Sequence, residues 1–146
     1  MNSDRVRVLI GEQGVNLLVL GTVQHIKLTG AETEGAYTLL EESGPVGSGV
    51  PEHVHHSEDE TYFVLKGTYE FTVGGKTLRA GAGTMVFAPR QVPHSMEVVG
   101  DVPAKVLTLI SPPGLERMFE DLSQLGGDAE PDEVGAICRK YGVEFV

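Results

Sequence analysis

The chain has 146 residues, 40% of them apolar and 22% charged, a balance typical of a globular domain with its own core and not of a disordered segment. Its 11 lysine and arginine residues against 21 aspartate and glutamate residues give a net charge of −10. So acidic a surface repels nucleic acids and anionic membranes, and we expect neither as a partner.

The N-terminal residues do not have the pattern of an export signal or a membrane anchor. The longest apolar run there, residues 15–20, is interrupted by Asn16 and is too short to span a bilayer. Cys138 is the single cysteine, which excludes an intrachain disulfide. We therefore expect a cytoplasmic protein.

Residues 1–110 read as short strands separated by turns. The expected strands are residues 17–20, 24–28, 37–41, 61–66, 68–73, 76–80, 85–88, 94–99 and 105–110, with glycines between several of them. So many short strands at close spacing predict an all-β sandwich or barrel and not a sheet alternating with helices.

The clearest element is a hairpin around Gly74 and Gly75, because a two-residue turn of this kind needs positive φ at both positions. The expected cross-strand pairs are Val73 with Lys76, Thr72 with Thr77, Phe71 with Leu78, and Glu70 with Arg79. This register places apolar side chains on one face and polar or oppositely charged pairs on the other, which supports it.

The C-terminal part changes to helical spacing. Apolar side chains recur at i, i+3, i+4 and i+7 in two sets: Leu115, Met118, Phe119 and Leu122, then Val134, Ile137, Cys138 and Tyr141. We expect the first helix to begin at Ser111 or Pro112 and to end before Gly126, and the second to begin at Pro131 and end before Gly142. Both stripes are expected to pack against the barrel.

Histidines with the spacing of metal ligands lie in the middle of the chain. His53 and His55 point to the same face of a strand because side chains alternate with a period of two. A carboxylate returning on the next strand and a third imidazole, His94, would complete a mixed nitrogen and oxygen site. Such a site suits one divalent transition metal: Fe, Mn, Ni, Cu, Zn or Co.

The same residues carry a family resemblance. The pattern Gly47-x5-His53-x-His55-x4-Glu60-x6-Gly67 resembles the first motif of the cupin superfamily. The pattern Gly83-x5-Pro89-x-Gln91-x2-His94-x3-Val98 resembles the second, with Gln91 in place of the usual glycine and Val98 in place of the usual asparagine. Neither departure affects a usual metal ligand.

The resemblance implies a double-sheet jelly roll, or double-stranded β-helix, over residues 1–110. A helical extension and a short terminal strand, residues 111–146, would complete one domain. It also selects Glu60, and not Glu58 or Asp59, as the carboxylate ligand beside His53, His55 and His94.

Side-chain parity extends these expectations. If Glu60 points inward, Tyr62 and Val64 do too, and the apolar opposite face of residues 61–65 suggests a strand covered on both sides. We expect His56 to face solvent. His25 is expected at the surface or the barrel rim, with the pocket mouth as the alternative.

A pocket beside the metal is expected from the same parity. The candidate lining residues are Tyr62, Phe71, Val73, Met85, Phe87 and Met96. An apolar pocket with a Lewis acid at its base suits a small aromatic or β-dicarbonyl molecule.

Residues 53–67 look like the single-domain cupins grouped with quercetin 2,3-dioxygenase. On that resemblance we expect a metal-dependent dioxygenase acting on a small enolic or phenolic substrate, flavonol-like or β-dicarbonyl-like, with Glu60 as general base. One alternative is a redox-silent isomerase, lyase or polyketide cyclase with the same ligands. The other is a non-catalytic cupin that binds a small molecule.

A homodimer is also expected, because residues 5–10 and 143–146 are β-prone and either can pair across a two-fold axis.

Overall fold

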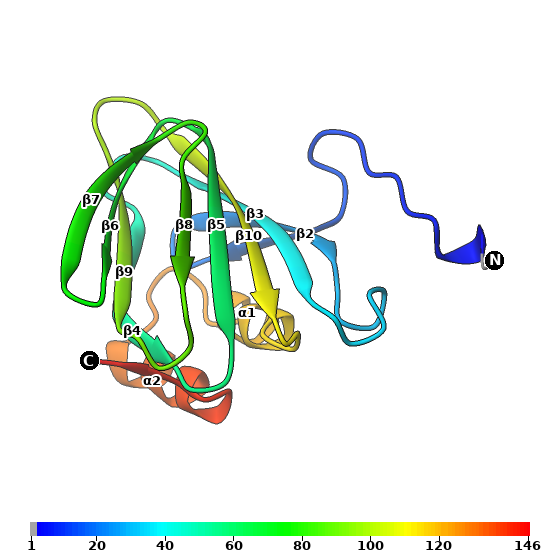
Figure 1. Ribbon diagram of the computed structural model, residues 1–146. Helices are drawn as coiled ribbons and strands as arrows, with labels where there is room; N and C mark the ends of the chain where they lie inside the picture. Colours follow the sequence, from blue (N-terminus) through cyan, green and yellow to red (C-terminus); the bar gives the residue numbers. More distant parts are fainter. Residues whose placement is uncertain (1–2) are drawn as a thin grey trace.

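The computed structural model describes residues 3–146 and is dominated by strands (Figure 1). The strands are β1 Val15–Val19, β2 Thr22–Leu28, β3 Thr38–Gly44, β4 Gly49–His55, β5 Asp59–Lys66, β6 Thr68–Val73, β7 Lys76–Gly81, β8 Met85–Ala88, β9 His94–Val99, β10 Ala104–Ser111 and β11 Val143–Phe145. The helices are a short 3-10 helix, Ser3–Arg5, followed by α1 Glu116–Ser123 and α2 Pro131–Lys140.

The strands form two antiparallel sheets that face each other. One has the order β1-β2-β3-β10-β5-β8 and the other the order β11-β4-β9-β6-β7. Inward side chains of both sheets meet in one apolar cluster that includes Val64, Phe71, Val98 and Val106. The predicted all-β jelly roll is therefore confirmed.

The hairpin register is confirmed at every predicted pair, from Val73 opposite Lys76 to Glu70 opposite Arg79. Gly74 and Gly75 have φ values of 56° and 79°, which an L side chain adopts only with strain. On the outer face the Thr72 and Thr77 hydroxyls lie 2.8 Å apart.

Two of the expected pocket residues face outward instead. Met85 and Phe87 are 57% and 52% exposed, so their assignment to the barrel interior is wrong. Strand β8 pairs with β5 so that Ala88 lies opposite Glu60, and parity then turns Val86 and Ala88 inward. Phe63 and Leu65 on the outer face of β5 are also exposed, so residues 61–65 are covered on one side only.

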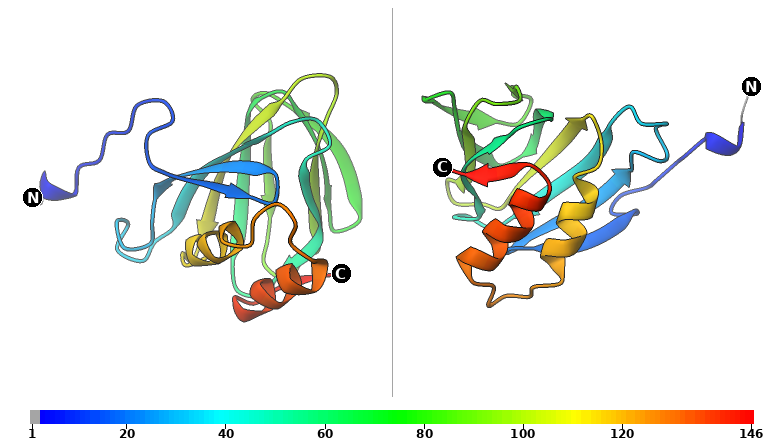
Figure 2. Two further views of the ribbon diagram at one scale, coloured as in Figure 1. Left: turned by 180° about the vertical axis from the view of Figure 1, so that it is seen from behind. Right: turned by 90° about the horizontal axis from the view of Figure 1, so that it is seen from below.

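The two helices cover the end of the barrel near β1 and β11, where Figure 2 shows them side by side. Helix α2 begins at Pro131 as predicted, with a capping box between Glu130 and Glu133. Helix α1 begins later than predicted, because β10 continues to Ser111 and the chain then turns before Glu116. The predicted stripes do pack inward: Leu115, Met118, Leu122, Val134 and Cys138 are buried in a second apolar cluster.

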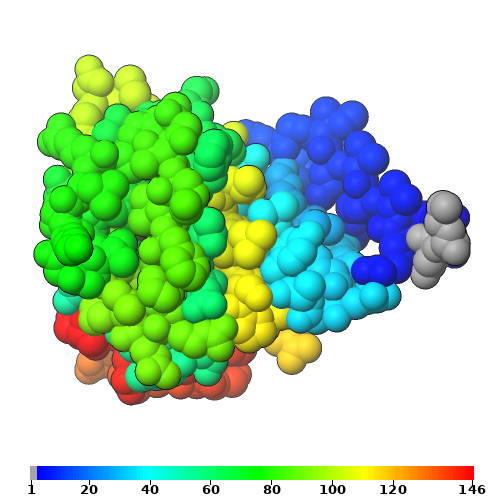
Figure 3. Space-filling view, in the orientation of Figure 1, coloured from blue at the N-terminus to red at the C-terminus, as the bar shows by residue number. Residues whose placement is uncertain are grey.

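The N-terminal segment extends away from the barrel, as the blue atoms in Figure 3 show. Val6, Val8 and Ile10 on it are each about three-quarters exposed (74%, 75% and 75%). Ion pairs from Arg5 to Glu34, at 2.9 Å, and from Arg7 to Glu32 hold the segment beside the loop that precedes β3. No helix within residues 3–146 is long and apolar enough to cross a membrane.

Candidate metal centre

Four side chains from three strands converge inside the barrel. His53 and His55 lie on β4, His94 is the first residue of β9, and Glu60 comes from β5 in the facing sheet. In the register of β4 with β9, His53 lies directly opposite His94. One ligand atom of each of the four residues lies within 4.8 Å of all the others, and each residue is at most 4% exposed. The structure thus brings the four predicted ligands together.

Backbone carbonyls fix the orientation of two of the imidazoles. His53 Nδ1 lies 2.8 Å from the carbonyl oxygen of Pro51, and His94 Nδ1 lies 3.1 Å from that of Val92. A carbonyl can only accept, so Nδ1 is the donor in each contact, and in the neutral ring Nε2 has the lone pair that a metal would bind. Both Nε2 atoms therefore face the centre as potential ligands, the arrangement that a divalent metal requires.

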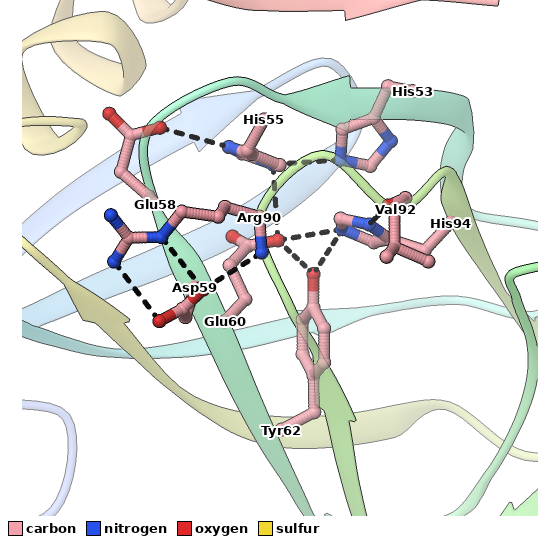
Figure 4. Close-up of polar contacts among 9 residues, drawn as sticks. All are labelled: His53, His55, Glu58, Asp59, Glu60, Tyr62, Arg90, Val92 and His94. Carbon is pink, nitrogen blue, oxygen red and sulfur yellow. Dashed lines mark hydrogen bonds and ion pairs between the residues drawn. The ribbon is translucent and has the colours of Figure 1, made fainter.

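The atoms at the centre are closely spaced (Figure 4). His53 Nε2 lies 3.0 Å from His55 Nε2, and Glu60 Oε2 lies 3.1 Å from His55 Nε2 and 2.8 Å from His94 Nε2. Lone pairs of three nitrogens and one oxygen at such distances repel unless a cation or shared protons lie between them. The donor set fits a divalent ion of borderline softness.

The charges of the centre are strongly coupled. Burial disfavours ionisation of Glu60, but the nearby His55 and His94 reverse this and hold the pKa of Glu60 well below its usual range. Burial also opposes the charge of His55, yet Glu60 and Glu58 raise its pKa to about 9. Burial and the neighbouring His94 lower the pKa of His53 to about 4. The carboxylate is therefore ionised at neutral pH and supplies the negative charge that a metal cation needs.

The two neighbouring acidic residues have other partners. Asp59 forms a two-pronged ion pair with Arg90 at 3.1 Å and also accepts the Arg90 backbone N–H at 2.8 Å. Glu58 Oε2 lies 3.8 Å from His55 Nδ1, behind the imidazole and away from the centre. The Arg90 contact was not predicted, since Arg90 lies 31 residues after Asp59 in the chain, between β8 and β9.

A cavity of about 100 Å³ is lined by three of the four side chains, His53, His55 and Glu60. Of the expected lining residues, Tyr62 and Met96 line it, whereas Phe71 is fully buried in the core and Val73 packs against that core. The remaining wall is partly apolar, from Met118, Phe119, Leu122, Val143 and Phe145, and partly polar, from Thr22, Gln24, Glu42 and Thr108. These two sets were not predicted, because α1, β2, β3, β10 and β11 all lie outside the two motifs in the chain.

The other two histidines lie outside the centre. His56 Nε2 forms a 2.9 Å contact with Glu144, and its half-exposed ring confirms the predicted solvent-facing position. The surface or rim position expected for His25 is wrong, because that residue is buried on β2. Its Nδ1 lies 2.5 Å from Asn16 Oδ1, and β1 covers it.

Comparisons with known proteins agree with this architecture. Residues 40–110 match the family model described as "Cupin domain". An uncharacterized protein of Methanocaldococcus jannaschii, MJ1618, is 33% identical over 76 residues, 52% of this chain and 61% of that protein. Quercetin 2,3-dioxygenase of Bacillus subtilis is 26% identical over 112 residues, 77% of this chain but only 33% of the dioxygenase.

A solved structure shares the fold over a similar span. The crystal structure of a predicted oxalate decarboxylase from Thermotoga maritima superposes with a TM-score of 0.57 at 29% identity, over 61% of this chain and 78% of that one. The family match, the two facing sheets and the convergence of His53, His55, Glu60 and His94 lead to one assignment: the chain belongs to the cupin family.

Proposed function

We propose that the protein is a metal-dependent enzyme that oxygenates a small enolic or phenolic substrate, with one divalent transition metal held by His53, His55, Glu60 and His94. The observation that carries the proposal is the meeting of three imidazole nitrogens and one carboxylate oxygen beside a cavity. A bound divalent ion supplies Lewis acidity toward an anionic substrate oxygen. With one carboxylate ligand, the site keeps a net positive charge that favours such an oxygen.

Glu60 is the proposed general base. Its Oε2 accepts a hydrogen bond from the Tyr62 hydroxyl, which holds the carboxylate at the edge of the cavity. Glu60 is ionised, and it could accept the proton of an enol or phenol whose oxygen is made more acidic by a divalent ion held at the site. The apolar side chains of Met96, Met118 and Phe119 exclude water around that proton transfer.

The size of the cavity restricts the substrate. Its volume of about 100 Å³ is of the same order as the ~150 Å³ of an engineered protein cavity that binds benzene, a single ring. A single-ring enol or a short β-dicarbonyl matches this volume better than a three-ring flavonol. The dioxygenase that resembles this chain supports the reaction class, and the cavity supports the smaller substrate.

A redox-silent lyase or isomerase is the second candidate, because the same four ligands around Zn can polarise a substrate without oxygen. The 29% identity to a predicted oxalate decarboxylase favours it. Oxygen consumption separates the two candidates. A dioxygenase consumes oxygen in step with 2,4-pentanedione or another small enol, whereas a redox-silent enzyme turns over without oxygen.

The first experiment is the metal content of the purified protein, measured by mass spectrometry for wild type, His94→Ala and His56→Ala. We expect about one equivalent in wild type and in His56→Ala, and a large loss in His94→Ala. His56 is the matched control because it neighbours the ligands in sequence but faces Glu144. Failure of wild type to take up any divalent ion would overturn the proposal.

A further inference from the structure

The cavity has a polar wall on the sheet that also carries Glu60. Gln24 on β2 and Thr108 on β10 line it and are only 3% and 2% exposed. Within residues 3–146, Gln24 Oε1 and Thr108 Oγ1 have no hydrogen-bond partner. Buried polar atoms in native proteins are nearly always paired, so two unpaired atoms on one cavity wall indicate a group that they bind.

The orientation of the Gln24 amide is fixed by its neighbour Glu42. The two residues lie opposite each other in the register of β2 with β3, and the Gln24 side chain partly offsets the rise that burial causes in the pKa of Glu42. The Glu42 carboxylate also accepts the Thr22 hydroxyl at 3.2 Å. Protonated or ionised, Glu42 keeps a carboxyl oxygen that can accept from the amide nitrogen, which would leave Gln24 Oε1 as the unpaired acceptor.

The polar wall continues from the metal centre across the sheet. Thr108 lies directly opposite Tyr62 in the register of β10 with β5, and Tyr62 contacts Glu60. Gln24 and Glu42 lie on the next strands beyond β10 in the same sheet. Thr108 is one strand from Glu60 and Gln24 is three strands from it, so a molecule seated at Glu60 meets Gln24 only by reaching across the cavity that all three residues line.

We propose that Gln24 and Thr108 bind a hydroxyl group on the far edge of the substrate, away from its metal-binding oxygens. The inference rests on the proposed function, since it assumes that an enolic oxygen occupies the metal end. Gln24 Oε1 can only accept, so its partner must carry a hydrogen, and the Thr108 hydroxyl can donate or accept. A hydroxyl meets both requirements, whereas a methyl, ether or carbonyl group leaves Gln24 Oε1 unpaired.

The test uses two pyranones that differ by one hydroxyl. Kojic acid carries a hydroxymethyl group where allomaltol carries a methyl group, and both present the same enolic chelating oxygens. Their dissociation constants are measured by calorimetry on Zn-loaded protein, because Zn has no redox chemistry that would consume them. We expect kojic acid to bind wild type about three- to tenfold more tightly, as one added neutral hydrogen bond gives.

Near-isosteric variants identify the residues involved. Gln24→Met and Thr108→Val each remove a polar atom and keep the volume, and Thr72→Val on the outer hairpin is the matched control. The preference for kojic acid should fall toward one in at least one cavity variant and stay unchanged in Thr72→Val, with Zn content equal in all.

The outcomes separate the two proposals. Equal binding of both pyranones to wild type overturns the hydroxyl site and leaves the metal site standing. A preference that survives in both cavity variants also overturns the assignment to Gln24 and Thr108. If neither pyranone binds the Zn-loaded wild type, the proposed function fails and the hydroxyl site fails with it.

Discussion

The Tyr62 hydroxyl donates a hydrogen bond to Glu60 Oε2, the carboxylate oxygen that also lies 2.8 Å from His94 Nε2. Tyr62 thereby orients a proposed ligand without being one. Partners of this kind typically change metal affinity by about 10- to 100-fold when they are removed.

Tyr62→Phe should therefore bind metal about tenfold more weakly than wild type while keeping its fold, since the ring still packs against Phe71. Competition with a chromogenic chelator measures the affinity. Tyr69→Phe is the matched control, because Tyr69 lies in the same core but does not line the cavity. Equal affinities of Tyr62→Phe and wild type would show that the hydroxyl does not position Glu60.

Metal binding should stabilise the folded chain. An ion that binds only the native state contributes RT ln(1 + [L]/Kd), about 2.7 kcal/mol at a concentration of 100 Kd. We expect removal of the ion by a chelator to lower the melting temperature of wild type by several degrees. The double variant His53→Ala, His55→Ala should melt at one temperature with or without metal, and a metal-dependent shift in it would place the ion elsewhere.

Glu116 should stabilise the protein in a pH-dependent way. Burial opposes its charge, but hydrogen bonds from the Thr38 hydroxyl at 2.6 Å and from the Gly30 N–H at 2.8 Å lower the pKa of Glu116. A depressed carboxyl pKa adds stability above the unfolded-state pKa, and that stability is lost as the pH falls through the folded-state pKa. Glu116→Gln should cost about 1–3 kcal/mol at pH 7 in urea denaturation. The difference should shrink in acid, and one independent of pH would contradict this role.

Glu42 should change the pH dependence of stability in the direction opposite to Glu116. Burial raises the pKa of Glu42 from 4.5 to about 7, so the folded state holds this proton over a range in which the unfolded state releases it. The contribution of Glu42 to stability therefore falls as the pH rises from about 4.5 to about 7. In metal-free protein, Glu42→Gln should gain about 3 kcal/mol on wild type over that interval and no more above it. Parallel stability curves of the two proteins would refute the buried carboxyl.

The protein should form a homodimer. A second copy would cover two exposed apolar surfaces. One is the N-terminal segment, with Val6, Val8 and Ile10, and the other is the outer face of β5 and β8, with Phe63, Met85 and Phe87. Light scattering should give a dimer at micromolar concentration, and deletion of residues 1–10 should weaken association at least tenfold. A monodisperse wild-type monomer would rule the dimer out. The other candidate segment, residues 143–146, pairs through β11 with β4 of its own chain.

Period-two patterning and turn chemistry made most strands predictable, and the hairpin at Gly74 and Gly75 was predicted to the residue because its two faces differ in polarity. Strand β8 has no such contrast: Met85, Val86 and Phe87 are all apolar, and only pairing with β5 decides which face is inside. Alternating polarity predicts the buried face of a strand only when the other face is polar, so it gives no answer where both faces are apolar.

Strand β2 reverses the usual pattern in which apolar side chains face the interior and polar side chains face solvent. Thr22 and Gln24 point into the barrel, while the apolar Val23 is 38% exposed, because this part of the interior is a cavity and not a packed core. The buried position of His25 likewise depends on Asn16 and on the cover that β1 provides, which sequence spacing alone does not reveal. The four proposed ligands were predictable because their spacing reproduces a family motif.

The division of the four ligands between two sheets has a mechanical consequence. Three imidazoles project from the sheet that contains β4 and β9, and the single carboxylate of Glu60 projects from the sheet that contains β5. An ion bound by all four would therefore act as a cross-link between the layers, comparable in effect to a covalent staple that shortens the free loops of the unfolded chain. Removing it would take away that link, so metal occupancy and the separation of β4 and β9 from β5 would be set by the same event.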